Sequence, residues 1–143
     1  IQQASMLKPM YSRIEVNKLL TKNMKLLSPE KGKLVVLGDI DLLKYLFELL
    51  QKQDSEENIM IDVDDLSPKY IVFHLYMSQL QLSDEDCTNL FAPDIKHIPY
   101  MVCKQIVREN GECFNRHRCG IIAYNTKQGT TLSITLSQAK KEQ

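Results

Sequence analysis

Two short runs of carboxylates are the residues best placed to do chemistry. Gly38-Asp39-Ile40-Asp41 and Asp62-Val63-Asp64-Asp65 each follow or close an apolar run that predicts a buried strand. If those strands are parallel, both runs emerge at one carboxyl edge of the sheet, where ligands bind in open α/β folds. Carboxylates gathered there could hold a magnesium ion. Because acids after strands are also ordinary helix caps, the pattern leaves capping and metal-dependent phosphotransfer open.

The second run also carries a short family resemblance. The stretch Ile59 to Leu66 resembles the first motif of haloacid-dehalogenase-type phosphatases, whose Asp-x-Asp acids serve as nucleophile and acid/base. The resemblance implies those roles for Asp62 and Asp64. It covers eight residues, and the chain has no clear later lysine and acid pair of that family. Metal-dependent phosphotransfer is therefore an alternative and not the main hypothesis.

Thiol and imidazole side chains suggest a zinc site. Cys113, His117 and Cys119, with Cys103 as a fourth ligand, make a set that zinc accepts. Their spacing is not that of a standard zinc knuckle, and thiols in or near the core are the alternative. The chain also lacks a glycine-rich phosphate loop and a Gly-x-Ser-x-Gly elbow. We therefore predict no catalytic residue, no metal and no cofactor.

Cationic and aromatic side chains interleave in the last third of the chain. On an open sheet, such side chains suit single-stranded RNA or DNA, because cations contact phosphates and rings stack on bases. The alternative is a solvated strand face, charged to prevent edge pairing, or a contact with a protein. The candidate nucleic-acid contacts are Lys96, Lys104, Arg108, Arg116, Arg118, Tyr100 and Phe114.

Charge is unevenly distributed although 18 Lys and Arg balance 18 Asp and Glu over 143 residues. Residues 1–33 contain seven basic and two acidic side chains. Residues 34–95 contain three basic and thirteen acidic side chains, and residues 96–143 contain eight basic and three acidic ones. Separate blocks of this kind create strong surface fields, whereas blocks that fold against each other cancel.

The first half predicts a helix followed by a β-α-β unit. Ser12 and Glu15 form a capping box before apolar residues at helical spacing, which predicts a helix over 13–26. Strands are expected at Leu34–Leu37 and Ile59–Val63, around a helix over 42–53 capped by Asp39 or Asp41. The two strands would be parallel, with a right-handed crossover.

The second half predicts one more helical stretch and then hairpins. Ser67 and Pro68 favour a helix over 70–80, although a strand remains an alternative for these residues. Ser83 predicts the start of a short helix, and Pro93 and Pro99 bracket a linker. Four strands are predicted: Tyr100–Arg108, Glu112–His117, Gly120–Asn125 and Thr131–Ser137. Turns at Asn110-Gly111 and Thr126–Gly129 join them into hairpins.

These elements predict an α/β or α+β fold: a mixed sheet with an N-terminal helix, a β-α-β unit, C-terminal antiparallel hairpins, and helices packed on the sheet. We expect a flexible tail or cloning scar over 1–9, one globular domain over 10–137, and a frayed tail over 138–143.

Over residues 34–137 this order resembles the anticodon-binding domain of class II aminoacyl-tRNA synthetases and related non-synthetase C-terminal domains. The segment that carries the likeness is Ile98-Pro99-Tyr100, which resembles that family's entry to a central strand. The resemblance implies a non-catalytic RNA-binding or dimerising module. It makes Lys104, Arg108, Arg116 and Arg118 the candidate contacts.

The sequence thus favours a non-catalytic macromolecular-interaction module of a larger intracellular protein, which mediates protein–protein association, including self-association. The alternatives are an RNA or single-stranded nucleic-acid-binding module and the phosphotransfer enzyme. Neither a signal peptide nor an apolar run long enough for a membrane helix is visible, so we expect no membrane partner. We also expect no small-molecule substrate.

Overall fold

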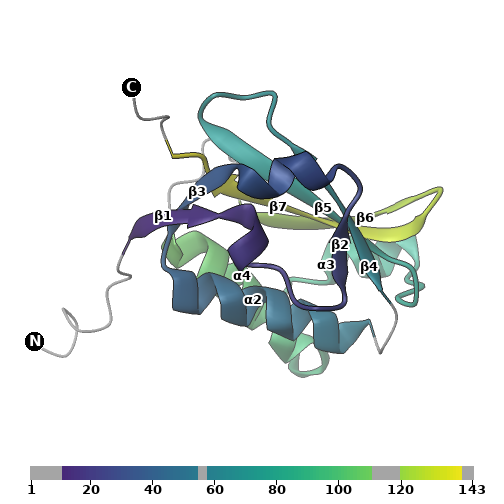
Figure 1. Cartoon of the computed structure of the whole chain (residues 1–143). Coiled ribbons are helices and arrows are strands. Elements are labelled where there is room, and N and C mark those ends of the chain that lie inside the picture. Colours follow the sequence, from purple (N-terminus) through teal and green to yellow (C-terminus); the bar gives the residue numbers. More distant parts are fainter. Residues whose placement is uncertain (1–10, 55–57, 111–119, 140–143) are drawn as a thin grey trace, which may run out of the picture.

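The computed structural model describes residues 11–54, 58–110 and 120–139 (Figure 1). Its strands are β1 (Ser12–Glu15), β2 (Met24–Leu26), β3 (Val35–Gly38), β4 (Ile59–Asp64), β5 (Tyr70–Met77), β6 (Ile121–Thr126) and β7 (Gly129–Ser137). Its helices are η1 (Val16–Lys18), η2 (Pro29–Lys33), α2 (Ile40–Gln53), α3 (Asp84–Asn89), η3 (Ile95–His97) and α4 (Ile98–Asn110).

Within the described residues, the main sheet has five strands in the order β2-β4-β5-β7-β6. β2 and β4 are parallel, and the other neighbours are antiparallel. A separate antiparallel pair, β1 and β3, joins this sheet through a bridge between Val36 and Gln138. The predicted fold class is confirmed: a mixed α/β fold with helices packed on a mixed sheet.

The core lies between the sheet and two helices. Alternate residues of β4 and β5 are buried, as expected for strands with one covered face. α2 and α4 pack against each other and lie on the same side of the main sheet (Figure 1). The rings of Phe47 in α2 and Phe73 in β5 meet edge to face, with centroids 5.5 Å apart. The two helices therefore cover one face of the sheet, and the other face carries a mixture of polar and apolar side chains, such as His74 and Val72.

The capping prediction for α2 is confirmed. The Asp39 carboxylate accepts hydrogen bonds from the backbone N–H groups of Asp41 and Leu42, at 3.0 and 3.3 Å. The buried face of α2 consists of Leu43, Leu46, Phe47 and Leu50. α2 thus begins directly after β3 and buries one of its faces.

The helix predicted over 13–26 is wrong. Ser12–Glu15 forms β1, which pairs with β3, and Met24–Leu26 forms β2, which adds to the edge of the main sheet beside β4. Strand partners supply hydrogen bonds that a local capping box cannot outweigh, so tertiary context overrides the helical spacing.

The predicted β-α-β unit is also wrong, although its strands and helix exist. β3 pairs with β1, whereas β4 pairs with β2 and β5, so the strands that flank α2 belong to different sheets. The helix favoured over 70–80 is instead β5, which was the alternative left open. Its side chains alternate between buried and half-buried positions, which fits a strand with one covered face.

The strand predicted over Tyr100–Arg108 is helical. Tyr100, Cys103, Val107 and Asn110 are buried at intervals of three and four residues, which is the period of a helix. Asn110, predicted as a hairpin turn residue, ends α4, and its side chain accepts from the Asp39 N–H at 2.8 Å. The short helix after Ser83 and the β6–β7 hairpin are confirmed. Residues 112–117 lie outside the described part.

None of the helices in the described part is long and apolar enough to cross a membrane.

Candidate functional site

The two acidic runs do not meet at one edge of a sheet. Leu34, just before β3, lines the same cavity as Asp65, just after β4, so the end of β4 lies beside the start of β3. Asp39 follows the opposite end of β3, where it caps α2. Among the described residues, no three His, Cys, Asp or Glu side chains gather as a metal site would require. The magnesium cluster of the phosphotransfer alternative is therefore not assembled among these residues.

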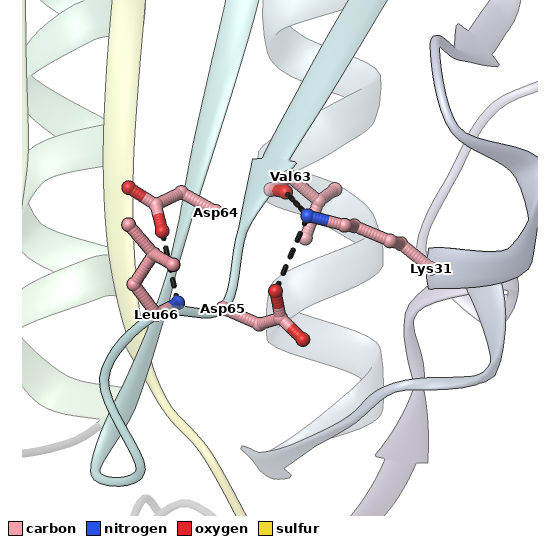
Figure 2. A network of polar contacts seen from close by, with 5 residues as sticks. All are labelled: Lys31, Val63, Asp64, Asp65 and Leu66. Atoms are coloured by element: carbon pink, nitrogen blue, oxygen red, sulfur yellow. Dashed lines mark hydrogen bonds and ion pairs between the residues drawn. The ribbon is translucent and has the colours of Figure 1, made fainter.

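The acids at the end of β4 are used locally. Figure 2 shows two neighbouring carboxylates that point apart: Asp64 accepts from the Leu66 N–H at 2.9 Å, and Asp65 pairs with the Lys31 ammonium at 3.2 Å. Lys31 also donates to the carbonyl of Val63 at 2.8 Å. These contacts fix the turn between β4 and β5, which is a structural role.

The predicted nucleic-acid contacts do not share a sheet. Lys104 and Arg108 lie on α4, Lys96 lies on η3, and Tyr100 is only 6% exposed, too buried to stack on a base at the surface. Phe114, Arg116 and Arg118 lie outside the described residues. The prediction that these residues share a basic sheet is therefore wrong, because those that the structure describes lie on helices. Contact of these residues with nucleic acid stays a prediction.

The zinc hypothesis is not tested, because Cys113, His117 and Cys119 lie outside the described residues. Cys103 is fully buried, and burial raises the pKa of its thiol from 9.0 to about 12. A zinc ligand must be a thiolate, so the surroundings of Cys103 disfavour that role.

An aromatic and polar cluster between α2 and α4 is the site that the sequence analysis missed. We define the α2–α4 cluster as Asp54, Phe91, His97 and Tyr100. The Tyr100 ring lies edge to face with Phe91, at 6.0 Å between centroids, and with His97, at 6.3 Å. Asp54, at the end of α2, is fully buried and accepts from the Gln79 N–H at 2.9 Å. Residues from three separate segments thus converge.

The electrostatics of the cluster keep the Tyr100 hydroxyl protonated. Burial, followed by the nearby Cys103 and Asp54, raises the pKa of Tyr100 from 10.0 to about 12. The Nδ1 atom of His97 is shielded from solvent and has no hydrogen-bond partner among the described residues. Flat rings around a buried hydrogen-bonding group are the surroundings that a planar heteroaromatic ligand requires. The sequence pattern that could have indicated the buried position of Tyr100 is the helical spacing of apolar residues from Tyr100 onward.

The rim of the cluster is apolar and basic. Ile95 is 84% exposed and Ile98 is 51% exposed, in the segment that leads into α4. Lys96 stands between them in sequence, and the Asp94 carboxylate accepts from its backbone N–H at 2.9 Å. This rim can therefore contact both an apolar surface and a negatively charged group.

A second polar network lies on the uncovered face of the sheet. His74 Nδ1 is 2.7 Å from the Ser133 hydroxyl, and the Tyr124 hydroxyl lies 2.7 Å from the same serine oxygen and 3.2 Å from His74 Nδ1. Asp62 is the cross-strand neighbour of His74. Three neighbouring strands, β5, β7 and β6, supply His74, Ser133 and Tyr124, which hydrogen-bond to one another.

No protein-family model matches the sequence, and no curated protein matches it. Solved structures do match. The catalytic domain of the histidine kinase ThkA, in a nucleotide-free form, has a TM-score of 0.63 and 15% identity over 92% of this chain and 99% of its own. The mycobacterial sensor histidine kinase MprB has a TM-score of 0.67 and 9% identity, over 92% of this chain and 100% of its own. The ATP-binding domain of PrrB from Mycobacterium tuberculosis has a TM-score of 0.56 and 12% identity, over 91% of this chain and 98% of its own.

These neighbours overturn two of our interpretations. They are a histidine-kinase catalytic domain, a sensor histidine kinase and an ATP-binding domain. The resemblance to an anticodon-binding domain is therefore wrong, and a non-catalytic association or RNA-binding module is not supported. The likeness fails because its one sequence segment, Ile98-Pro99-Tyr100, begins a helix and not a central strand. This chain therefore has the fold of the ATP-binding catalytic domains of histidine kinases.

Proposed function

We propose that this chain is the ATP-binding domain of a phosphotransfer protein of the histidine-kinase kind. The observation that carries the proposal is the extent of the structural match. Each neighbour is covered over 98% or more of its own length, and each covers at least 91% of this chain. The similarity therefore involves a complete domain and not a shared supersecondary motif.

The α2–α4 cluster is the place we propose for the base of the nucleotide. An adenine ring would pack beside His97 and Ile98, with Tyr100 behind them, because flat apolar and aromatic surfaces bind purines. Tyr100 and Asp54 are buried, so the segment from Phe91 to Ile98 has to move outward for the ring to enter. The exposed isoleucines of that segment would then contact the bound base.

Lys96 is the residue we propose for the phosphates. It adjoins the start of the 13-residue helix α4, where exposed backbone N–H groups and the helix dipole favour anions. Asp94 places a carboxylate at this same turn, so a phosphate must compete with it. The chain has only five glycines, so a lysine side chain is a more available phosphate contact than a glycine-rich loop.

The predicted carboxylate chemistry has no part in this proposal. Phosphotransfer was our alternative interpretation, but Asp39 caps a helix, and Asp62 lies beside His74 on the uncovered face of the sheet. A divalent cation that arrives with the triphosphate would be held mainly by phosphate oxygens and water.

Calorimetric titration of the full chain with ATP and magnesium tests the proposal. We expect saturable binding and a rise in melting temperature that grows with ATP concentration, since a ligand of the folded state stabilises it by mass action. Lys96→Ala should weaken binding about three- to tenfold, the effect of losing one charge-assisted contact. Lys127→Ala removes an exposed lysine from the β6–β7 turn and is the matched control. Absence of saturable binding at millimolar ATP would contradict the proposal.

A further inference from the structure

A cavity lies away from the α2–α4 cluster, where the two-stranded sheet meets the main one. Its volume is about 400 Å³, within the range of small-ligand sites. The residues that line this cavity are Leu34, Asp65, Leu66, Ser67, Pro68, Gln138 and Ala139. We call it the β3–β4 cavity, because Leu34 precedes β3 and Asp65 follows β4.

The backbone around this cavity is held by the fold itself. Ala139 donates its N–H to the carbonyl of Val35 at 3.0 Å, and Gln138 donates its own to the carbonyl of Lys69 at 2.9 Å. On the other wall, the Ser67 hydroxyl oxygen accepts from the Lys69 N–H at 3.1 Å. These main-chain contacts leave the Gln138 side chain with no part in the ladder.

Two of the residues that line the cavity carry acceptor atoms. Gln138 Oε1 is shielded from solvent and has no hydrogen-bond partner among the described residues. Such a group is costly unless a partner occupies the site at least part of the time. The Asp65 carboxylate, whose side chain is 34% exposed, adds a second acceptor and a negative charge.

The charge around the cavity selects the ligand. Lys31, the cation beside Asp65, is already bound to that carboxylate and to the carbonyl of Val63 (Figure 2). Asp64 adds a further negative charge at the same turn. Apart from Ser67, the remaining residues of the wall are apolar, and one of them, Leu66, is 91% exposed. A ligand that suits these features has N–H donors and positive charge at one end and an apolar stem.

We propose that the β3–β4 cavity binds a guanidinium or primary ammonium group on an apolar stem. The cationic head donates to the Asp65 carboxylate and, after a turn of the Gln138 side chain, to its Oε1 atom. The stem lies along Leu34, Leu66 and Pro68. A free organic cation and the side chain of an arginine or lysine in a peptide share this chemistry. This inference does not rest on ATP binding, because the cavity shares no residue with the α2–α4 cluster.

Titration of the isotope-labelled full chain with n-butylguanidinium, followed by amide NMR shifts, tests the proposal. We expect saturable shifts at millimolar ligand confined to the amides of Asp65, Leu66, Ser67, Gln138 and Ala139. Butanol, which has the same stem without charge, should give no saturable shift. A short peptide with one arginine identifies the source: tighter binding than butylguanidinium indicates a protein side chain, and weaker binding indicates a free cation.

Two variants separate a site from a structural role. Gln138→Met removes the acceptor and keeps the backbone contacts, so binding should weaken at least fivefold while the melting temperature rises. Asp65→Asn should weaken binding about tenfold. Glu85→Gln makes the same charge change on α3 and should leave binding unchanged. Shifts that do not saturate, or equal binding by wild type and Gln138→Met, would overturn the proposal.

Discussion

The two faces of the five-stranded sheet are built by the same strands on opposite principles. Facing the helices, Ile61, Phe73, Leu75 and Ile134 are fully buried and aliphatic or aromatic. On the other face, the next residues along these strands are polar, and His74, Ser133 and Tyr124 bond to one another. One face is thus stabilised by burial and close packing, the other by a small hydrogen-bond network in which Ser133 is buried and His74 and Tyr124 are half-buried.

The difference teaches where stability and adaptability reside. Burial of a large side chain against α2 contributes several times more than the net value of one hydrogen bond on the uncovered face. Substitutions on the covered face should therefore threaten the fold, whereas those on the uncovered face should adjust it. The predictions that follow test this contrast, beginning with the largest expected effect.

Phe73→Ala should be the most destabilising change. Phe73 is fully buried and meets Phe47 edge to face at 5.5 Å, so truncation leaves a cavity and removes an aromatic contact. We expect the free energy of unfolding to fall by about 3–5 kcal/mol in urea denaturation. Val72→Ala, at the next position and on the uncovered face, is the matched control and should cost about 1 kcal/mol or less. Equal losses would contradict the contrast between the faces.

Alkaline pH should destabilise the covered side. Burial raises the pKa of Tyr100 from 10.0 and that of Cys103 from 9.0, both to about 12. Above the ordinary pKa values, the unfolded chain loses protons that the folded chain keeps. Stability is therefore complete below pH 9 and declines as pH rises toward 12.

Tyr100→Phe isolates the tyrosine contribution to this decline. The variant should lose about 2 kcal/mol less than the wild type between pH 10 and 12, measured by urea denaturation at each pH. Tyr45→Phe, which changes an exposed tyrosine on α2, should leave the slope of the wild type unaltered. If both variants follow the wild-type curve, the ionisation of Tyr100 does not couple to folding.

Tyr124→Phe probes the network of the uncovered face. The change removes the hydroxyl that lies between Ser133 and His74 but leaves the half-buried ring in place. We expect a loss of about 1 kcal/mol, the usual net value of one hydrogen bond. A double-mutant cycle with Ser133→Ala should show coupling, because both substitutions break the same contact. Strictly additive losses would mean that the network contributes nothing as a unit.

Much of the fold could be predicted where local pattern and tertiary context agree. The β6–β7 hairpin has two β-rich runs around a polar turn, and α2 has a strong cap and an apolar face, so both were predictable. At Ser12–Leu26 they disagree: the capping box favours a helix, but strand partners far along the chain decide the outcome. Which strands pair is a long-range property that periodicity cannot report.

The candidate site was less predictable than the fold. Tyr100 was singled out, but as an exposed stacking residue of a strand, because its helical spacing with Cys103 and Val107 was not recognised. Asp54 lies far from Tyr100 in the sequence, and only the packing of α2 against α4 brings them together. The acids at the ends of strands were visible in the sequence, yet their separation depends on β3 and β4 belonging to different sheets.

The smallest effect on the free energy of unfolding is expected at the ion pair between Lys31 and Asp65, which lies at the end of β4. Their side chains are 31% and 34% exposed, so water screens the attraction and ordering two side chains offsets part of it. Asp65→Asn should therefore lower the free energy of unfolding by about 0.5 kcal/mol at low salt and by less in 1 M sodium chloride. Glu85→Gln supplies the background for a lost surface charge. A loss for Asp65→Asn as large as that for Tyr124→Phe would mean that the turn after β4 stabilises the domain as much as the hydrogen-bonded face does.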